Sequence, residues 1–183
     1  MSATFLVTGF EPFAEHRSNA SWDALLLLRE SWPAHIVTRR LPVDRRAAHE
    51  LLTSTLSELR PRAVLCTGIA RGEIFRIEHR ARRPEALALE PGMDDIEGRW
   101  PWSEMQAALD ASGVTTLHSY DAGQYVCEST YWSLLNHRDP RLPAAPEYAA
   151  FLHVPPASAA CPLELIARAV GRVVDERSAA LED

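Results

Sequence analysis

Three residues, Cys127, His153 and Glu78, are candidates for nucleophilic catalysis. Cys127 follows the turn-like stretch 121–126 (DAGQYV), where a loop meets a helix-like pattern. At a helix start, free backbone N–H groups and the helix dipole can stabilise a thiolate, and the same N–H groups can bind an oxyanion. The alternative for an isolated cysteine is a buried, inert thiol.

A thiolate nucleophile needs a histidine as general base and a third group that orients the imidazole. His153 ends an apolar predicted strand, and sites in open α/β sheets gather beyond the carboxyl ends of strands. On the residues alone, it can equally be a structural histidine. Glu78, in the alternating segment 73–81, is the candidate orienting group. Its alternative is a surface carboxylate paired with Arg76 or Arg80.

The other two cysteines have different surroundings. Cys66 lies in the middle of the predicted strand 61–68 and is expected in the core, whereas Cys161 precedes a helix and is a second candidate nucleophile. Three cysteines without a CxxC pair argue against a disulfide scaffold or zinc cluster and favour a cytoplasmic protein. The histidines show no paired metal-ligand spacing, so we expect no metal or other cofactor.

The segments that must position these residues alternate between strand and helix patterns. Predicted strands cover residues 4–9, 35–42, 61–68, 73–81, 114–120 and 148–154. Predicted helices cover residues 20–31, 45–60, 103–113, 128–137 and 161–177, with Ser18 or Asn19 capping the first and Asp44 the second. The alternation predicts a single domain over residues 1–183, an α/β fold of three α/β/α layers with a mixed, mainly parallel sheet.

Composition and charge narrow the class of function. The chain has 183 residues, of which 46% are hydrophobic and 24% charged, as in an ordinary globular domain. Its net charge of -6 argues against a general binder of nucleic acid or anionic membranes. No segment approaches the roughly eighteen apolar residues of a membrane span, and the first ten residues lack the basic start of a signal peptide.

Three motifs, in the same order along the chain, resemble the pyroglutamyl peptidase I family, also called pyrrolidone-carboxylate peptidases. They are residues 7–13 (VTGFEPF), 122–127 (AGQYVC) and 151–155 (FLHVP), and the resemblance runs from residue 5 to about 175. The family consists of cysteine peptidases that remove an N-terminal pyroglutamate with a Glu-Cys-His set. The resemblance therefore implies that Cys127 is the nucleophile and His153 its base, without a metal.

The residue that corresponds to the family's catalytic glutamate depends on how the two sequences are aligned. Ungapped counting from Gly68 puts His79 where the family has glutamate, whereas one deleted residue puts Glu78 there. The stretch 77–81 (IEHRA) is more similar to the family's Glu-Arg-Val-Ala pattern with the deletion. Glu78 is therefore the predicted acid, and a replaced acid is the alternative.

Other positions depart from the family pattern. Glu128 follows the nucleophile where the family usually has asparagine, and Ala88 stands where it has a downstream arginine, although Arg82 and Arg83 are close in sequence. The loops between residues 82 and 101 and before His153 are short for the family. In the family, these loops help to form the wall of the substrate site and the subunit contacts. A homo-oligomer is therefore one of the alternatives for this chain.

The resemblance also implies a substrate site. Pyroglutamate is a flat, neutral lactam with one apolar edge, so its recognition needs an apolar slot and backbone partners for the lactam. Aromatic and apolar residues of the motifs would form the slot, the backbone after the third strand would bond the lactam, and an asparagine lies beside the site. These candidates are Phe10, Phe13, Asn19, Ile69, Tyr125 and Val126. Alternatively, Phe10 and Phe13 form a hydrophobic lid over the sheet edge.

The predicted function is hydrolysis of the amide bond after an N-terminal pyroglutamyl residue. The predicted partner is a small peptide or amide substrate, with no nucleic acid and no membrane. Two alternatives remain: a divergent amidohydrolase that acts on another small lactam or amide, and a binding homologue without turnover. The short loops and Glu128 favour the first of these alternatives.

Overall fold

The computed structural model describes residues 4–13, 17–90, 92–137 and 145–182. The described strands form one six-stranded sheet and a separate two-stranded sheet. From edge to edge, the large sheet contains β2 (Ile36–Leu41), β1 (Phe5–Phe10), β3 (Ala63–Ile69), β8 (Tyr148–Val154), β4 (Phe75–Glu78) and β7 (Thr116–Ser119). The Pro-rich loop before β8 lies in part outside the described residues.

The large sheet is mixed but mainly parallel. Its neighbouring strands pair in parallel except β4 and β8, which are antiparallel. Strand order reverses between β1 and β3, because the chain first adds β2 on one side of β1 and then β3 on the other. Ligands of open α/β sheets bind at the carboxyl ends of strands beside such a switch point.

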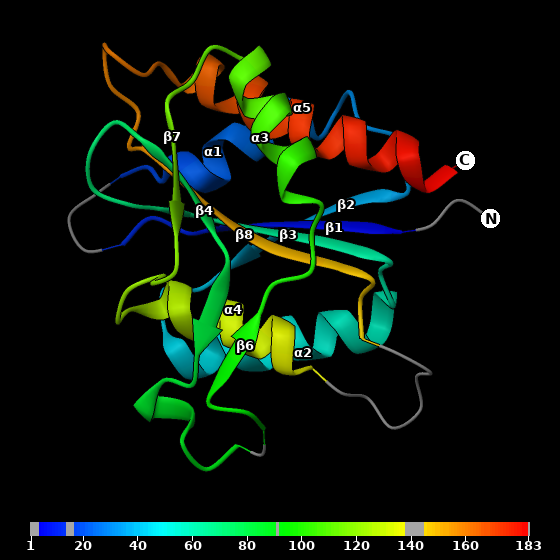
Figure 1. Cartoon of the computed structure of the whole chain (residues 1–183), viewed down its shortest axis with the longest axis vertical. Coiled ribbons are helices and arrows are strands. Elements are labelled where there is room, and N and C mark those ends of the chain that lie inside the picture. The colour runs from blue at the N-terminus through cyan, green and yellow to red at the C-terminus, as the bar shows by residue number, and fades with distance from the viewer. Residues whose placement is uncertain (1–3, 14–16, 91, 138–144, 183) are drawn as a thin grey trace.

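Helices cover both faces of the sheet, as Figure 1 shows. One face carries α1 (Ala20–Leu28), α3 (Trp102–Ala111) and α5 (Leu163–Glu182), and the other carries α2 (Arg45–Leu59) and α4 (Val126–Asn136). The three-layer α/β/α architecture expected from the alternating pattern is confirmed. Among the described residues, no helix is both long and apolar enough to span a bilayer.

Two apolar clusters form the core, one on each side of the sheet. The strands β1, β3 and β8 are buried almost throughout, as expected for parallel strands covered on both faces. Alternate side chains of each strand enter opposite clusters. The cluster beneath α2 and α4 contains Cys66, Phe151 and Cys127.

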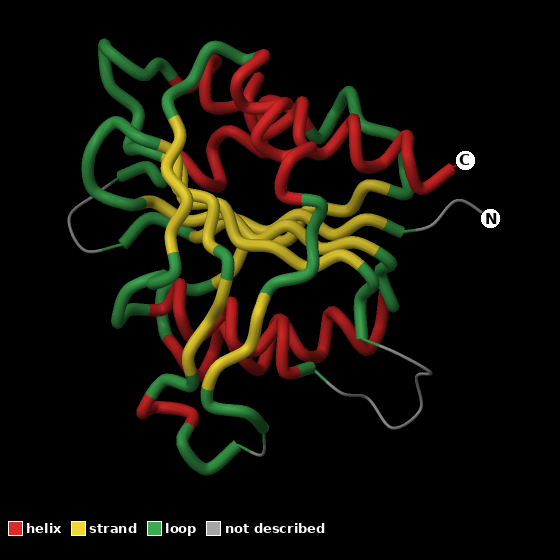
Figure 2. Tube along the Cα trace, viewed as in Figure 1, coloured by secondary structure: helices red, strands yellow, loops and turns green. Residues whose placement is uncertain are grey.

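The segment 73–81 is not one strand, in contrast to the sequence prediction. It divides into β4 and β5 (Arg80–Arg82), and β5 leaves the large sheet to pair with β6 (Asp95–Glu97). Strands β5 and β6 and the 3-10 helix η1 (Glu85–Leu87) extend past α4, as Figure 2 shows. Both pieces are extended, so the side-chain alternation alone does not reveal the break.

Helix ends follow the sequence closely in two cases. The side chain of Asn19 caps α1 and that of Asp44 caps α2, as expected. Other boundaries differ from the prediction; in particular, α4 begins at Val126 rather than at residue 128, and α5 continues to Glu182 rather than ending at residue 177. The earlier start of α4 puts Cys127 inside the first helical turn.

Candidate active site

The candidate catalytic residues meet on the sheet face that α4 covers. Strand β8 lies between β3 and β4, and its His153 is paired with Gly68 on one side and with Arg76 on the other. Paired residues of neighbouring strands point to the same face. Gly68 and the side chains of His153 and Arg76 therefore form a row across the sheet.

Glu78 contacts the imidazole directly. Its Oε1 lies 2.7 Å from Nδ1 of His153, and the glutamate is fully buried. Glu78 is two residues beyond Arg76 on β4, so it shares the face of His153 and lies diagonal to it. His79 instead has its ring against Trp102 and Tyr120. Of the two residues that the alignment left open, the structure places Glu78 beside His153.

Cys127 approaches the sheet from above Gly68. Its side chain hydrogen bonds with His153, and the residue is 9% exposed. Tyr125 is the N-cap of α4, but its side chain makes no capping hydrogen bond. The first-turn N–H groups beside the sulfur therefore lack a side-chain cap, which is the arrangement needed to hold a developing oxyanion.

Burial and neighbouring groups shift the pKa values of His153, Cys66 and Cys161. Burial alone would lower the pKa of His153, but hydrogen bonds and charge interactions with Cys127 and then Glu78 outweigh burial and raise the pKa to about 9. The imidazole is therefore protonated near neutral pH. Burial raises the pKa of Cys66 to about 12, and burial also raises the pKa of Cys161. These two thiols are therefore protonated near neutral pH.

Glu128, next to the candidate nucleophile, is turned away into the protein. Its Oε1 accepts a hydrogen bond from the backbone N–H of Arg82 on β5, and the residue is 5% exposed. Burial raises the pKa of its carboxyl to about 7, although the Arg82 hydrogen bond opposes this change. Glu128 therefore ties the start of α4 to β5, a role that the sequence did not reveal.

The arginines near the position of the family's downstream arginine are engaged elsewhere. The Arg82 guanidinium lies 3.7 Å from Asp95 and 3.9 Å from Asp121. The Arg83 guanidinium lies over the ring of Trp132. Ala88 is the C-cap of η1, so these residues supply no obvious substitute for that arginine.

The candidate substrate residues lie at the carboxyl ends of β1 and β3 and at the start of α4. Phe10 is buried in the same apolar cluster as Cys127 and Val126. Phe13 and Tyr125 are 40% and 77% exposed, so their rings are accessible to a ligand. Ile69 is the last residue of β3, directly after Gly68.

Asn19 fixes the loop that follows β1. Its Nδ2 donates to the carbonyl oxygen of Glu11, while its Oδ1 accepts from the N–H and the hydroxyl of Ser21. The Ser21 hydroxyl also accepts from the N–H of Phe10. Glu11 in turn accepts from the N–H of Val43. Asn19 thus acts on the candidate site by holding the Phe10 loop against α1.

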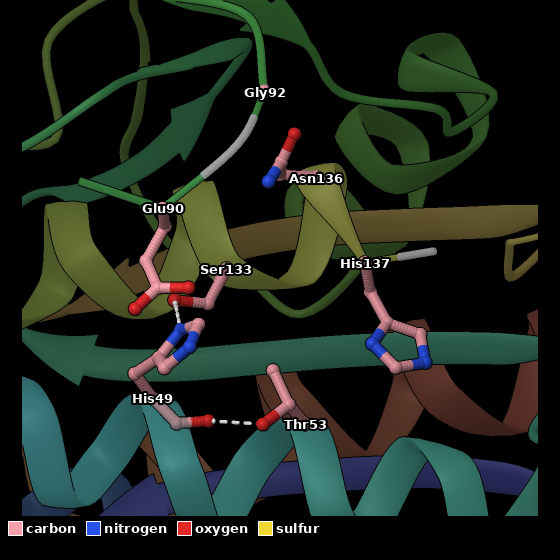
Figure 3. Close-up of a pocket in the computed structure, with 7 residues that line it drawn as sticks. All are labelled: His49, Thr53, Glu90, Gly92, Ser133, Asn136 and His137. Carbon is pink, nitrogen blue, oxygen red and sulfur yellow. Dashed lines mark hydrogen bonds between the residues drawn. The ribbon is translucent and has the colours of Figure 1, made fainter. Parts of the chain in front are cut away.

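A cavity of about 440 Å³ lies between α2, α4 and the segment around Glu90. Figure 3 shows His49 of α2 directed toward Ser133 of α4, with 2.8 Å between Nδ1 and Oγ. None of the residues that line this cavity belongs to the candidate catalytic set. Among the described residues, no three His, Cys, Asp or Glu side chains are grouped so that they could hold a metal ion.

Sequence reasoning missed one residue of this site. Arg76 was considered only as a surface ion-pair partner of Glu78, whereas the structure places it directly opposite His153. The signal was the spacing of two residues between Arg76 and Glu78 in an alternating segment, which puts both on one face.

Comparisons with known proteins point to one family. Residues 3–86 match the family model described as pyroglutamyl peptidase. The pyrrolidone-carboxylate peptidase of Gloeobacter violaceus is 31% identical over an alignment of 167 residues, and the match covers 82% of this chain and 80% of that protein. The pyrrolidone-carboxylate peptidase of Clavibacter michiganensis is 30% identical over an alignment of 169 residues, and the match covers 83% of this chain and 78% of that protein.

Solved structures share the fold. A mutant pyrrolidone carboxyl peptidase from Pyrococcus furiosus superimposes with a TM-score of 0.82 at 22% identity, covering 97% of this chain and 99% of that one. Pyrrolidone carboxyl peptidase from Thermococcus litoralis gives a TM-score of 0.81 at 22% identity, covering 98% and 95%. On the strength of the sequence relationship, the chain belongs to the pyroglutamyl peptidase family.

Proposed function

We propose that this protein is a cysteine exopeptidase that hydrolyses the amide bond after an N-terminal pyroglutamyl residue. The observation that carries the proposal is the buried chain of contacts from Glu78 through His153 to Cys127, with 2.7 Å between Glu78 Oε1 and His153 Nδ1. The family relationship supports the substrate, because relatives are named pyrrolidone-carboxylate peptidases.

In the proposed reaction, the Cys127 sulfur attacks the pyroglutamyl carbonyl carbon, and the carbonyl oxygen becomes an oxyanion. The first-turn N–H groups of α4 stabilise that charge. His153 donates its proton to the leaving nitrogen as the C–N bond breaks, which releases the shortened peptide and leaves a thioester. His153 then accepts a proton from water, and the water oxygen attacks the thioester to release pyroglutamate and regenerate the thiolate.

Glu78 orients the imidazole and stabilises its protonated form. Because the carboxylate is fully buried and its Oε1 bonds Nδ1, the other ring nitrogen is left to serve Cys127 and the leaving group. The elevated pKa of His153 supports this role, since Cys127 and Glu78 both favour the imidazolium. No metal enters these steps.

The lactam would occupy a slot beside the sulfur. The accessible rings of Phe13 and Tyr125 supply apolar surface, the buried Phe10 and Val126 pack beneath it, and the backbone at Ile69 offers hydrogen bonds. A neutral lactam gives no charge to bind, so shape and backbone polarity must select it. Asn19 contributes by holding the Phe10 loop in position.

The test is turnover of a fluorogenic pyroglutamyl amide by the wild type and by Cys127→Ala, beside a panel of ordinary aminoacyl amides. Release from the pyroglutamyl compound alone, abolished in the variant, supports the proposal. Turnover of another lactam or amide instead would favour the divergent amidohydrolase. If Cys127 resists alkylation and no amide is cleaved, the protein is a binding homologue.

The compartment and partners form part of the same proposal. Cys66, Cys127 and Cys161 are all free thiols, which supports a reducing compartment such as the cytoplasm. The net charge of -6 supports a partner other than nucleic acid.

A further inference from the structure

The candidate site residues lie in a fixed order across the neighbouring strands of the sheet. Cys127 lies over Gly68 on β3, His153 follows on β8, and Arg76 comes next on β4. In the proposed reaction, His153 must reach both the sulfur and the leaving nitrogen. The leaving residue therefore lies on the far side of His153 from the Phe10 loop, over β4 and β7.

This side of the sheet is open. Arg76 is paired with Leu117 of β7, so the two side chains share the face of His153. β7 is the edge strand of the large sheet, and Leu117 is 51% exposed although it is a large apolar side chain. Beyond His153, the sheet surface therefore presents the positive charge of Arg76 and then the apolar side chain of Leu117.

The Arg76 guanidinium is available for a ligand. Its Nη2 lies 3.4 Å from the carbonyl oxygen of Arg71, in the loop that follows β3, and it forms no ion pair with any described residue. The side chain is half-buried rather than extended into solvent. This contact holds the guanidinium near the carboxyl end of β3, where Ile69 and the scissile bond are proposed to lie.

We propose that Arg76 binds the α-carboxylate of the leaving amino acid and that Leu117 contacts its side chain, so that the enzyme prefers pyroglutamyl dipeptides with a free carboxyl end and an apolar second residue. The carboxylate of such a residue is only a few bonds from the leaving nitrogen. Guanidinium is the cation best suited to a carboxylate, because its N–H donors match the two oxygens. The inference rests on the proposed function.

The test compares kcat/KM for pyroglutamyl-leucine and pyroglutamyl-leucinamide, which differ only in having a carboxylate or a neutral amide at the carboxyl end. We expect the wild type to prefer the free acid. Arg76→Gln should lower kcat/KM for the acid about tenfold, the effect of losing a partly exposed charge-assisted hydrogen bond, and change the amide by less than about twofold. The preference should weaken as salt is added.

Two further variants make the test specific. Arg76→Lys keeps the charge but not the planar donor pair, so it should retain part of the preference. Arg168→Gln removes the same charge from an exposed position of α5, on the opposite face of the sheet. It should leave kcat/KM unchanged for both substrates. A loss in Arg168→Gln equal to that in Arg76→Gln would reduce the effect to net charge and overturn the assignment.

The outcomes separate the two proposals. If Arg76→Gln lowers kcat/KM equally for both substrates, or for neither, Arg76 does not bind the carboxylate. This inference then fails, while the proposed peptidase activity is unaffected. If the wild type cleaves neither pyroglutamyl compound, the proposed function fails, and the inference that depends on it fails as well. Only a loss confined to the free acid supports Arg76 as a specificity residue.

Discussion

The sulfur of Cys127 occupies the space that a side chain at Gly68 would fill. A β-carbon at Gly68 would stand 2.9 Å from Sγ and 2.9 Å from the ring of Phe151. Real β-carbons essentially never approach another heavy atom so closely, so with a side chain at residue 68 the Cys127 sulfur and the Phe151 ring would have to move. Glycine here is a condition for placing the sulfur beside His153.

Gly68→Ala should therefore displace Cys127 from the imidazole. We expect kcat to fall by about 100-fold, because a shift of roughly 1 Å in a reacting group has this effect, while the protein still folds. Activity and circular dichroism measure the two consequences. Gly171→Ala is the matched control, since its β-carbon would meet only the flexible end of Leu28 at 3.0 Å. Full activity in Gly68→Ala would show that the sulfur position is not critical.

Cys127 should be the first of the three cysteines to react with iodoacetamide in the native protein. Burial raises the pKa of Cys66 to about 12 and also raises the pKa of Cys161, so neither forms a thiolate near neutral pH. Mass spectrometry of peptides after short labelling gives the order, and Cys127→Ser should abolish the rapid phase. Earlier modification of Cys161 or Cys66 would contradict the nucleophile assignment.

Glu78→Gln should lower turnover by about 100-fold or more, because the imidazole loses the anion that orients it and stabilises its charge. His79→Gln is the neighbouring control, and it should have a much smaller effect because His79 packs against Trp102 and Tyr120. Steady-state kinetics of both variants decide the ranking. The reverse ranking would mean that Glu78 is not the acid of the site.

His153 should make the stability of the wild type fall at high pH. Its pKa is raised from 6.5 to about 9 in the folded state, so its stabilising contribution is complete below pH 6.5 and is lost as the pH rises through about 9. Urea unfolding across this window should show a steeper decline for the wild type than for Glu78→Gln, which has already lost one partner of the imidazolium. Parallel curves would argue against the charged pair.

Glu128 predicts a pH effect over a different window. Its pKa is raised from 4.5 to about 7, so the folded protein keeps a proton that the unfolded chain releases, and stability declines as the pH rises from 4.5 through about 7. Glu128→Gln keeps an oxygen to accept from the Arg82 N–H but cannot ionise. Thermal unfolding should show the variant more stable than the wild type above pH 7 and similar below pH 4.5. A difference independent of pH would refute this account.

Much of the fold and the candidate chemistry could be predicted from the sequence. Buried strands ending in glycine, helical spacing and the capping residues Asn19 and Asp44 predict the alternating α/β architecture, because these signals act over a few residues. The ordered motifs around Phe10, Cys127 and His153 indicated the family. Strand alternation also required that only one of Glu78 and His79 could face the site.

Only the tertiary structure decided how these elements meet. The sequence does not reveal that β8 lies between β3 and β4, that β4 runs antiparallel to it, or that Arg76 consequently stands opposite His153. It likewise does not reveal that Glu128 is buried against β5. The physical reason is that periodicity reports which side of an element is buried, whereas strand order, register and helix approach depend on packing between segments far apart in the chain.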